Sequence, residues 1–363
     1  VLSLTLSLVC ACGLLSQGCH PRHGKICCVK PAEQAVVENV LSKLGEIDAA
    51  VDSIITSSNA PGGVLLIHKE VSLVGKKVEW QQAFGNRSLW PKVEAATADT
   101  IYDLASLTKV VATAPSVMML WERGLIDVEA PAATYLPAFT NASQQSITVR
   151  HLLTHTSGLR PGIGRDGWSG YEGGIATACR ELPKQTPGTQ FVYSDINFIL
   201  LGEIVRTVSG KRIDEFALEN IYRPLGMTDT SYNPPKEKLP RVAPTQRYGD
   251  EVLHGVVHDP VARNMDGVAG HAGVFSTSDD LGIYCAMLLH EGRYGRNLEK
   301  QLFKPETVRL MATIQSPEAV EDKRSLGWDV ATGYSSPRGN VYPAGESFGH
   351  SGFTGTSMWI LPK

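Results

Sequence analysis

Ser106 and Lys109 are the two side chains whose types and spacing most directly indicate chemistry. Apolar residues around them recur at helical spacing, which predicts a helix and places positions three apart on one face. A serine hydroxyl is a weak nucleophile until a neighbouring base takes its proton, and a lysine amine can do this when its pKa is lowered. Free backbone N–H groups at the start of the helix would stabilise a developing oxyanion. Alone, the four-residue pattern favours an ordinary helix with an exposed lysine.

The composition is that of an ordinary globular protein, with 363 residues of which 42% are hydrophobic and 20% charged. A chain of this length can bury a large core, as one domain or as two lobes. The formal net charge of −3 gives no electrostatic footprint for nucleic acid, so no nucleic-acid partner is expected.

The first 18 residues carry no charge and resemble the apolar core of a signal peptide. The segment from Leu15 to Cys19 is similar to a bacterial lipoprotein cleavage site, although its leucine stands one place too far upstream. Cys19 is therefore the candidate for lipidation, and plain secretion is the alternative. Residues 20–32 are polar and predict a tether. We expect a bacterial protein that is periplasmic or secreted, and attached to a membrane where Cys19 is lipidated.

Hydrophobic periodicity and turn residues predict the main elements of secondary structure. Pro115 lies inside the helical pattern that follows Ser106 and should kink that helix. The expected helices are 33–55, 149–153, 195–208, 213–222, 278–290 and 305–312, and the expected strands are 64–68, 78–84, 326–330 and 352–361.

His151 and His155 stand four residues apart along the short helix expected at 149–153 and its end. This spacing could bind a metal, but no acidic third ligand and no H-E-x-x-H pattern accompany it. Structural or capping roles are therefore favoured, with Thr148 as the cap of the short helix. The glycine-rich loop from Pro161 to Gly174 carries Trp168, which we expect to line a cleft.

Ser347 is a second candidate nucleophile, because Gly345 to Gly349 fits the G-x-S-x-G elbow of α/β-hydrolases. That elbow needs a strand before the serine and a helix after it. Here the serine precedes a strand-like run, 358–361, and no Asp-then-His pair follows. The pattern therefore disfavours Ser347 as the nucleophile.

Three short patterns occur in one order along the chain: Ser106-x-x-Lys109, Tyr193-Ser194-Asp195, and His350-Ser351-Gly352, the last of which is expected to open a strand. With the LLTHTSGL segment of residues 152–159, they resemble the serine β-lactamase and penicillin-binding-protein superfamily, most closely its class C-like branch. That branch contains class C β-lactamases, family VIII carboxylesterases, D-aminopeptidases and DD-carboxypeptidases. The resemblance runs from about Ala60 to the end of the chain.

The resemblance implies that Ser106 is the acylated nucleophile and that Lys109 is its hydrogen-bonded partner. Tyr193 would act as general base or relay, with phenolate character supported by Lys109, and His350 would complete the catalytic set. Backbone N–H groups of Ser106 and Phe353 would form the oxyanion hole. The residues expected to contact substrate are Asp195, Ser351, Gly352 and Trp168.

Two positions depart from the pattern of the superfamily. Asp195 stands where the family usually has Asn, which would weaken the contact to the amide side chain of a β-lactam. His350 stands where β-lactamases usually have Lys, and a histidine carries little fixed charge near neutrality. Both departures favour ester or peptide hydrolysis over efficient β-lactam hydrolysis.

The resemblance implies an α/β (α+β) fold of the β-lactamase/transpeptidase type, with one hydrolase domain over residues 33–363. An antiparallel sheet built from both ends of the chain would be flanked by helices, and a mainly helical lobe would span about 103–270. The site should lie in the cleft between the lobes. In the superfamily a further strand and a long C-terminal helix follow the position of Lys363, so we expect these to be missing, which would leave a sheet edge uncovered.

The leading hypothesis is a serine acyl hydrolase that forms an acyl-enzyme on Ser106, needs no metal or organic cofactor and acts as a monomer. Its partners would be small-molecule substrates, namely short esters or D-amino-acid and cell-wall peptides. Alternatives are a non-catalytic or slow protein that binds β-lactams or peptidoglycan, a weak β-lactamase, and a metal-dependent hydrolase using His151, His155 and His271. The sequence leaves ester, amide and lactam substrates open.

Overall fold

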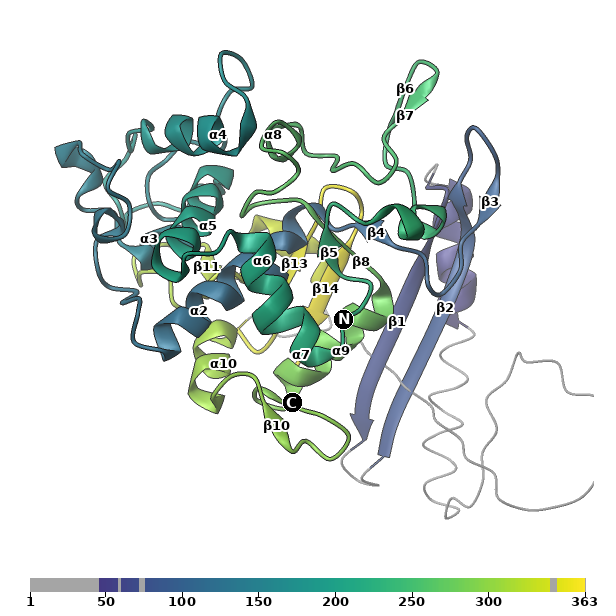
Figure 1. Cartoon of the computed structure of the whole chain (residues 1–363). Coiled ribbons are helices and arrows are strands. Elements are labelled where there is room, and N and C mark those ends of the chain that lie inside the picture. Colours follow the sequence, from purple (N-terminus) through teal and green to yellow (C-terminus); the bar gives the residue numbers. More distant parts are fainter. Residues whose placement is uncertain (1–45, 58–59, 72–75, 340–344, 363) are drawn as a thin grey trace, which may run out of the picture. The chain divides into compact units, whose positions relative to one another are not determined.

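A computed structural model describes residues 46–57, 60–71, 76–339 and 345–362 (Figure 1). The chain divides into two compact units, one ending at Thr100 and one beginning at Ile101. Among the described residues, no helix is both long enough and apolar enough to cross a membrane.

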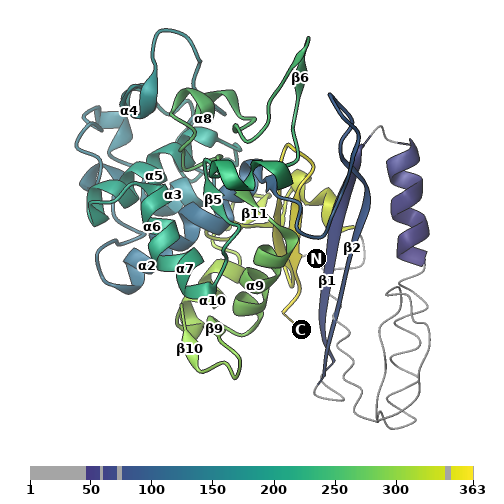
Figure 2. The ribbon, with the colours of Figure 1, turned by 45° about the vertical axis from the view of Figure 1, so that its right-hand side comes forward.

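The first unit consists of a helix over 46–57 and a long antiparallel hairpin. The hairpin pairs β1 (Gly62–Val71) with β2 (Lys76–Ser88), and the short β3 (Glu94–Ala95) adds to its edge. In Figure 2 the helix lies beside the β1–β2 ribbon. Both strands predicted here are confirmed and are longer than the apolar pattern indicated. Of the helix predicted at 33–55, the part before residue 46 lies outside the described residues.

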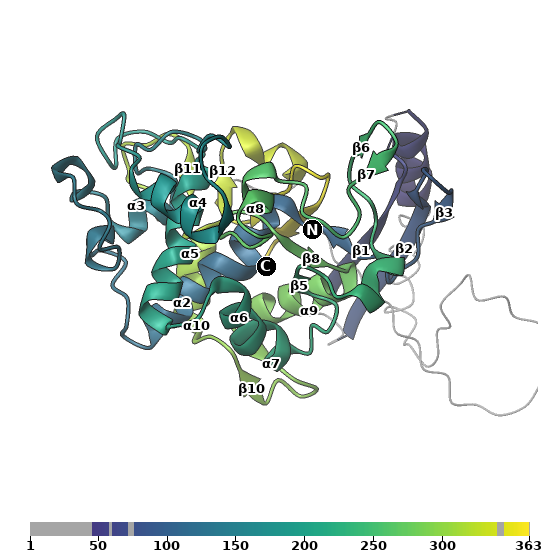
Figure 3. The ribbon, with the colours of Figure 1, turned by 45° about the horizontal axis from the view of Figure 1, so that its top comes forward.

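The second unit contains a cluster of helices around α5 (Asp195–Ser209), in which every residue from Ile196 to Val205 is buried. A helix that is buried on all sides needs mostly apolar residues, and the sequence provides them apart from the polar Asn197 and Glu203. Figure 3 shows α5 among its neighbours. These neighbours and the smaller helices are α2 (Ala114–Glu122), α3 (Val149–Leu153), α4 (Gly170–Cys179), α6 (Ile213–Ala217), α7 (Arg223–Leu225) and α8 (Pro260–Asn264).

Two sheets of the second unit carry the segments that matter for the site. The first has the order β4 (Tyr102–Asp103), β8 (Val274–Ser276), β5 (Ser231–Tyr232), and the second is the antiparallel series β11 (Lys323–Arg324), β12 (Asp329–Ala331), β13 (Phe348–Ser351), β14 (Ser357–Ile360). The remaining elements are α9 (Ser278–Leu289), α10 (Pro305–Ala312) and the two-stranded pairs β6 (Arg247–Tyr248) with β7 (Glu251–Val252) and β9 (Arg293–Tyr294) with β10 (Lys300–Gln301).

The helices predicted at 149–153, 195–208, 278–290 and 305–312 are confirmed within one residue, and 213–222 is helical but ends in a π-turn. Two strand predictions need correction. His350 lies inside β13 and does not open a strand, because a turn over 352–356 separates β13 from β14. Of the strand predicted at 326–330, only the last two residues belong to β12, because Gly327 has a φ of 94° and turns the chain. That both chain ends contribute to one sheet stays a prediction.

Candidate active site

Ser106 lies at the start of an irregular helical run. A 3₁₀ turn, η1 (Ala105–Leu107), leads into a π-turn, η2 (Lys109–Thr113), and α2 then follows with Pro115 in its first turn. The kink expected at Pro115 is therefore a change of helix type, because proline has no N–H to donate into the preceding turn. Ala105 has a φ of 45°, which is an unusual conformation for a residue with a Cβ and one that clusters at functional sites.

The amine of Lys109 is fully buried and has three acceptors. Its Nζ lies 2.9 Å from Ser106 Oγ, 2.8 Å from Asp195 Oδ1 and 3.1 Å from the carbonyl oxygen of His271. Burial lowers the pKa of Lys109, but the carboxylate of Asp195 and the hydroxyl of Tyr193 outweigh burial and raise it above 10.5. Lys109 is therefore an ammonium group that donates hydrogen bonds to Ser106 and to the His271 carbonyl and forms an ion pair with Asp195.

Tyr193 precedes α5 and is positioned by His155. The two rings are stacked with centroids 4.5 Å apart, and the Ser194 N–H donates to His155 Nδ1 at 3.1 Å. The His155 carbonyl also accepts the N–H of Val192 at 2.9 Å, so this histidine holds the chain on both sides of the tyrosine. Burial and nearby cations keep the pKa of His155 well below 6.5. His151 has the capping role that the sequence favoured, because its Nδ1 accepts the N–H of Thr148.

His350 projects from β13 toward Tyr193, with ring centroids 6.0 Å apart. Its Nδ1 lies 2.8 Å from the carbonyl oxygen of Ser351; a carbonyl can only accept, so Nδ1 carries the hydrogen. Burial, and then the charges of Arg324 and Lys109, hold the pKa of His350 well below 6.5. The imidazole is therefore neutral at physiological pH.

The turn after β13 packs directly on the backbone that carries Ser106. A Cβ on Gly352 would lie 2.4 Å from the carbonyl oxygen of Leu104, so only glycine fits there. Thr354 and Thr356 donate their hydroxyls to the carbonyls of Asp103 and Leu104 at 2.7 and 3.1 Å. These contacts bring the Phe353 backbone beside the nucleophile.

These segments line a cavity of about 260 Å³. Six of the residues named from the sequence line it, among them Phe353, which is 85% exposed. Sequence reasoning missed Arg324, Asp329 and Tyr334. A signal was available for Asp329, a charged residue within an apolar segment, whereas Arg324 ends a charged run that begins at Glu321. The complete lining is Ser106, Tyr193, Arg324, Asp329, Tyr334, His350, Ser351, Gly352 and Phe353.

Other predicted site residues lie outside that lining. Buried Lys109 contacts Ser106 Oγ, and Asp195 contacts Lys109. Trp168 belongs to a separate loop, where its indole N–H donates to the carbonyl of Gly164 at 2.7 Å. Cys19 lies outside the described residues.

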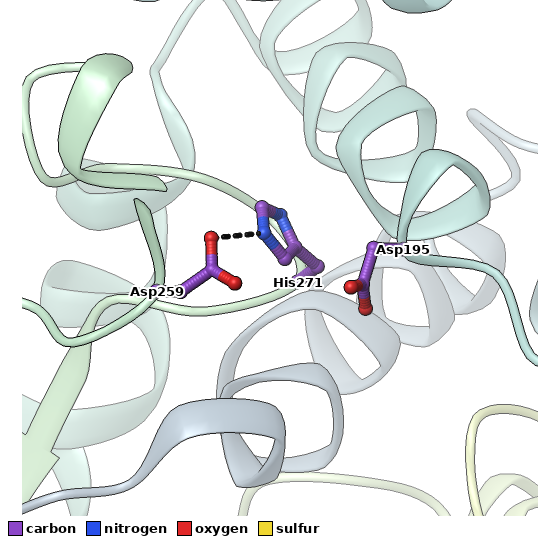
Figure 4. Close-up of side chains that lie close together, drawn as sticks. All are labelled: Asp195, Asp259 and His271. Carbon is purple, nitrogen blue, oxygen red and sulfur yellow. Dashed lines mark hydrogen bonds and ion pairs between the residues drawn. The ribbon is translucent and has the colours of Figure 1, made fainter. Parts of the chain in front are cut away.

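Asp195, Asp259 and His271 form the one group among the described residues whose atoms are close enough to hold a metal ion (Figure 4). His271 Nε2 lies 2.9 Å from Asp259 Oδ1, and this contact lowers the pKa of Asp259, although burial acts in the opposite direction. Asp195 Oδ1 is already paired with the ammonium of Lys109. A cation so close to a ligand atom would repel a metal, so we interpret the group as an ion-pair network.

The two rival sites of the sequence analysis find no support in this geometry. Ser347 is 1% exposed and precedes β13, whereas a nucleophile elbow needs a helix after the serine. Of the proposed histidine ligands, His151 and His155 accept backbone N–H groups and His271 pairs with Asp259.

Comparisons with known proteins agree on one family. A family profile described as Beta-lactamase matches residues 47–363. A putative D-alanyl-D-alanine carboxypeptidase of Escherichia coli strain K12 is 32% identical over 335 residues, covering 83% of this chain and 76% of that protein. An N-acetylmuramyl-L-alanine amidase of Bacillus subtilis strain 168 is 31% identical over 353 residues, covering 88% of this chain and 78% of that protein.

Among solved structures, a class C beta lactamase from Rhodobacter sphaeroides matches with a TM-score of 0.65 and 22% identity, covering 87% of this chain and 90% of that one. At this identity the likeness shows the fold alone, which is the expected β-lactamase/transpeptidase fold. The family profile and the curated relatives together indicate a serine acyl hydrolase. The chain belongs to the β-lactamase family.

Proposed function

We propose that Ser106 Oγ attacks the carbonyl carbon of an ester or amide and forms an acyl-enzyme that water then hydrolyses. The observation that supports this most directly is the 2.9 Å hydrogen bond from Lys109 Nζ to Ser106 Oγ at the wall of the cavity. Ser106 is only partly buried, so a substrate in the cavity can reach its hydroxyl.

Tyr193 is the group proposed to take the proton of Ser106. An ammonium group has no lone pair with which to accept a proton, and that of Lys109 donates to Ser106 and His271 and is paired with the carboxylate of Asp195. Lys109 therefore serves as a fixed positive charge, while Tyr193 receives the proton and returns it to the leaving group. Backbone N–H groups of Ser106 and Phe353 would hold the oxyanion, a contribution worth about 3 kcal/mol per donor.

The proposed substrates are short esters or peptides that contain D-amino acids, including cell-wall peptides. Two curated relatives carry the names of a carboxypeptidase and an amidase, which supports acyl groups of this kind. The neutral His350 supports the same choice, because no fixed charge stands where β-lactamases usually have lysine. The alternative is a protein that binds β-lactams and turns them over slowly or not at all. The substrate assay described below distinguishes it from an ester or peptide hydrolase.

We further propose export from the cytoplasm, to the periplasm or the medium, and a monomeric state. The uncharged run of residues 1–18 supports export, and Cys19 would attach the chain to a membrane if it is lipidated. Metabolic labelling with a palmitate analogue, compared between the full chain and Cys19→Ser, tests the attachment.

The test of the active-site assignment uses p-nitrophenyl acetate, nitrocefin and a D-alanyl-D-alanine peptide. Ser106→Ala should abolish turnover of whichever substrates the wild-type chain hydrolyses, and intact-mass spectrometry should show acetylation that maps to Ser106. Ser347→Ala is the matched control, because it removes the hydroxyl of the rival motif and should retain turnover. Unchanged p-nitrophenyl acetate hydrolysis by Ser106→Ala would refute the proposal, and labelling of Ser106 by nitrocefin without turnover would favour the binding protein.

A further inference from the structure

Asp103, at the end of β4, is a buried carboxylate that the proposed mechanism does not use. It is 1% exposed, and each of its two oxygens accepts a backbone N–H. Oδ1 accepts the N–H of Ala105 at 2.8 Å, and Oδ2 accepts that of His258 at 2.6 Å. No ion pair within the described residues includes Asp103, so burial raises the pKa of its carboxyl, although the two N–H donors act in the opposite direction. Burying a charge without a cation is costly, so these two hydrogen bonds are what hold the carboxylate in place.

The first oxygen of Asp103 fixes the residue before the nucleophile. Ala105 has a φ of 45°, a conformation that a residue with a Cβ adopts only at a cost. A carboxylate that accepts the N–H two residues later forms an Asx-turn, which holds the backbone locally. Without this contact, Ala105 would be more stable at a negative φ, and the rotation would displace Ser106. The hydrogen bond from Lys109 Nζ to Ser106 Oγ therefore depends on a turn that Asp103 holds.

The second oxygen of Asp103 connects the same carboxylate to the backbone that holds Lys109. It accepts the N–H of His258, and the next residue, Asp259, accepts Nε2 of His271 at 2.9 Å (Figure 4). The carbonyl oxygen of His271 in turn accepts from Lys109 Nζ at 3.1 Å. One side chain thus spans the segment that carries the nucleophile and the segment that holds the amine.

The turn after β13 is attached to the same point. The carbonyl oxygen of Asp103 accepts the hydroxyl of Thr354 at 2.7 Å. The ring of Phe353 stacks on the ring of His258, with centroids 5.4 Å apart and planes 21° apart. The backbone of Phe353, which is the proposed second oxyanion donor, therefore lies between two contacts to the Asp103–His258 pair.

We propose that Asp103 is a positioning residue that sets the geometry of Ser106 relative to Lys109 and to the Phe353 N–H. The inference rests on the proposed function, in which Ser106 Oγ is the nucleophile. Asp103 touches neither the substrate nor the reacting oxygen, and no proton passes through it. Its loss should therefore slow acylation without changing which hydroxyl is acylated.

Asp103→Asn is the first variant, because it keeps the shape of the side chain but leaves one acceptor oxygen for two N–H groups. The kcat/KM for p-nitrophenyl acetate should fall roughly ten- to hundredfold, as expected when a hydrogen bond to a charged group is lost. Asp280→Asn is the matched control. Asp280 is 5% exposed and accepts the Asp229 N–H and the Thr230 hydroxyl, both at 2.8 Å, outside the cavity lining. It should lower the midpoint of urea unfolding and leave kcat/KM within about twofold of wild type.

The decisive measurement is rescue by Ala105→Gly. Glycine adopts a positive φ without the Cβ penalty, so the turn no longer needs the carboxylate to hold it. Adding Ala105→Gly to Asp103→Asn should recover roughly five- to thirtyfold in kcat/KM. The gain should be smaller when Asp103 is present. A role of Asp103 in stability alone would change the urea midpoint but not kcat/KM of the folded protein.

Two outcomes would overturn the positioning role: a kcat/KM of Asp103→Asn within about twofold of wild type, or an equal gain from Ala105→Gly in both backgrounds. If Asp103→Asn does not fold by circular dichroism, Asp103→Ser takes its place, because it buries no amide donor against the two N–H groups. If neither variant folds, Asp103 is required for the fold and the positioning role is overturned. Failure of the proposed function is distinguishable, because Ser106→Ala would then hydrolyse p-nitrophenyl acetate at the wild-type rate.

Discussion

Replacing Asp195 by Asn tests whether the carboxylate keeps Lys109 charged. The two groups lie 2.8 Å apart, and Lys109 is fully buried while Asp195 is 32% exposed. At an effective dielectric constant of about 20, a unit charge pair at this distance attracts by about 6 kcal/mol. Desolvation offsets much of that, and the Asn oxygen can still accept a hydrogen bond. We therefore expect Asp195→Asn to lower the free energy of unfolding by about 1–3 kcal/mol.

The pH dependence of this loss has a definite sign. Asp195 raises the pKa of Lys109 above the value of 10.5 for an unfolded lysine, so the stabilisation is fully present below pH 10.5 and is lost only above it. Urea unfolding of the wild type and the variant at pH 7 and 9 should give the same difference. In kcat/KM for p-nitrophenyl acetate, the alkaline limb of the variant should move to lower pH, because Lys109 loses its proton earlier.

Asp259→Asn is the matched control, because it removes a carboxylate from the same network without a direct bond to Lys109. It should leave the alkaline limb closer to the wild-type position than Asp195→Asn does. The reasoning is refuted if Asp195→Asn moves the acidic limb to lower pH and raises activity at neutrality, since Lys109 would then be the base. It is also refuted if both limbs and the unfolding free energy stay at wild-type values.

Three further predictions concern the backbone and the buried histidines. Burial holds the pKa values of His155 and His350 well below 6.5, so their contribution to stability is present above pH 6.5 and is lost below it. Lowering the pH from 7.5 to 5.5 should therefore lower the free energy of unfolding by about 3 kcal/mol. A free energy of unfolding that stays constant over this range would contradict the prediction. Gly352→Ala places a Cβ 2.4 Å from the Leu104 carbonyl and should lower kcat/KM at least roughly tenfold, with a loss of about 1–3 kcal/mol in urea unfolding. Ala105→Gly relieves a φ of 45° and should stabilise by about 1 kcal/mol, so a lower Tm would count against strain at this residue.

The positions of several helices followed from the sequence because periodic and capped segments are local features, whereas the fold class was implied by the family resemblance. Helix 305–312 and the Thr148 cap agree with the structure, since proline, threonine and the apolar period act within one or two turns. The strand predicted at 326–330 was mostly wrong, because Gly327 takes a positive φ to fit against Ala114, a contact distant in sequence. The family was identified because several motifs occur together, and the Beta-lactamase profile confirms it.

The site was only partly accessible from the sequence. The motifs correctly predicted that Ser106, Tyr193 and His350 line one cavity, but they did not predict that Asp195 pairs with Lys109. The contact of Asp195 with substrate stays a prediction. His155 was given a structural role, which is correct, yet its stacking on Tyr193 could not be read from a four-residue spacing. Such contacts depend on how α3 and α5 pack, and packing is a tertiary property.

His350 stands at the third motif where β-lactamases usually have a lysine, but another residue brings a positive charge to the same cavity. From the sequence, a neutral His350 implied weak recognition of carboxylates, because only the motif position was considered. In the structure Arg324, from a different hairpin, lines the same cavity with unused donors. A guanidinium cannot be deprotonated near neutrality, so it supplies a charge that histidine lacks.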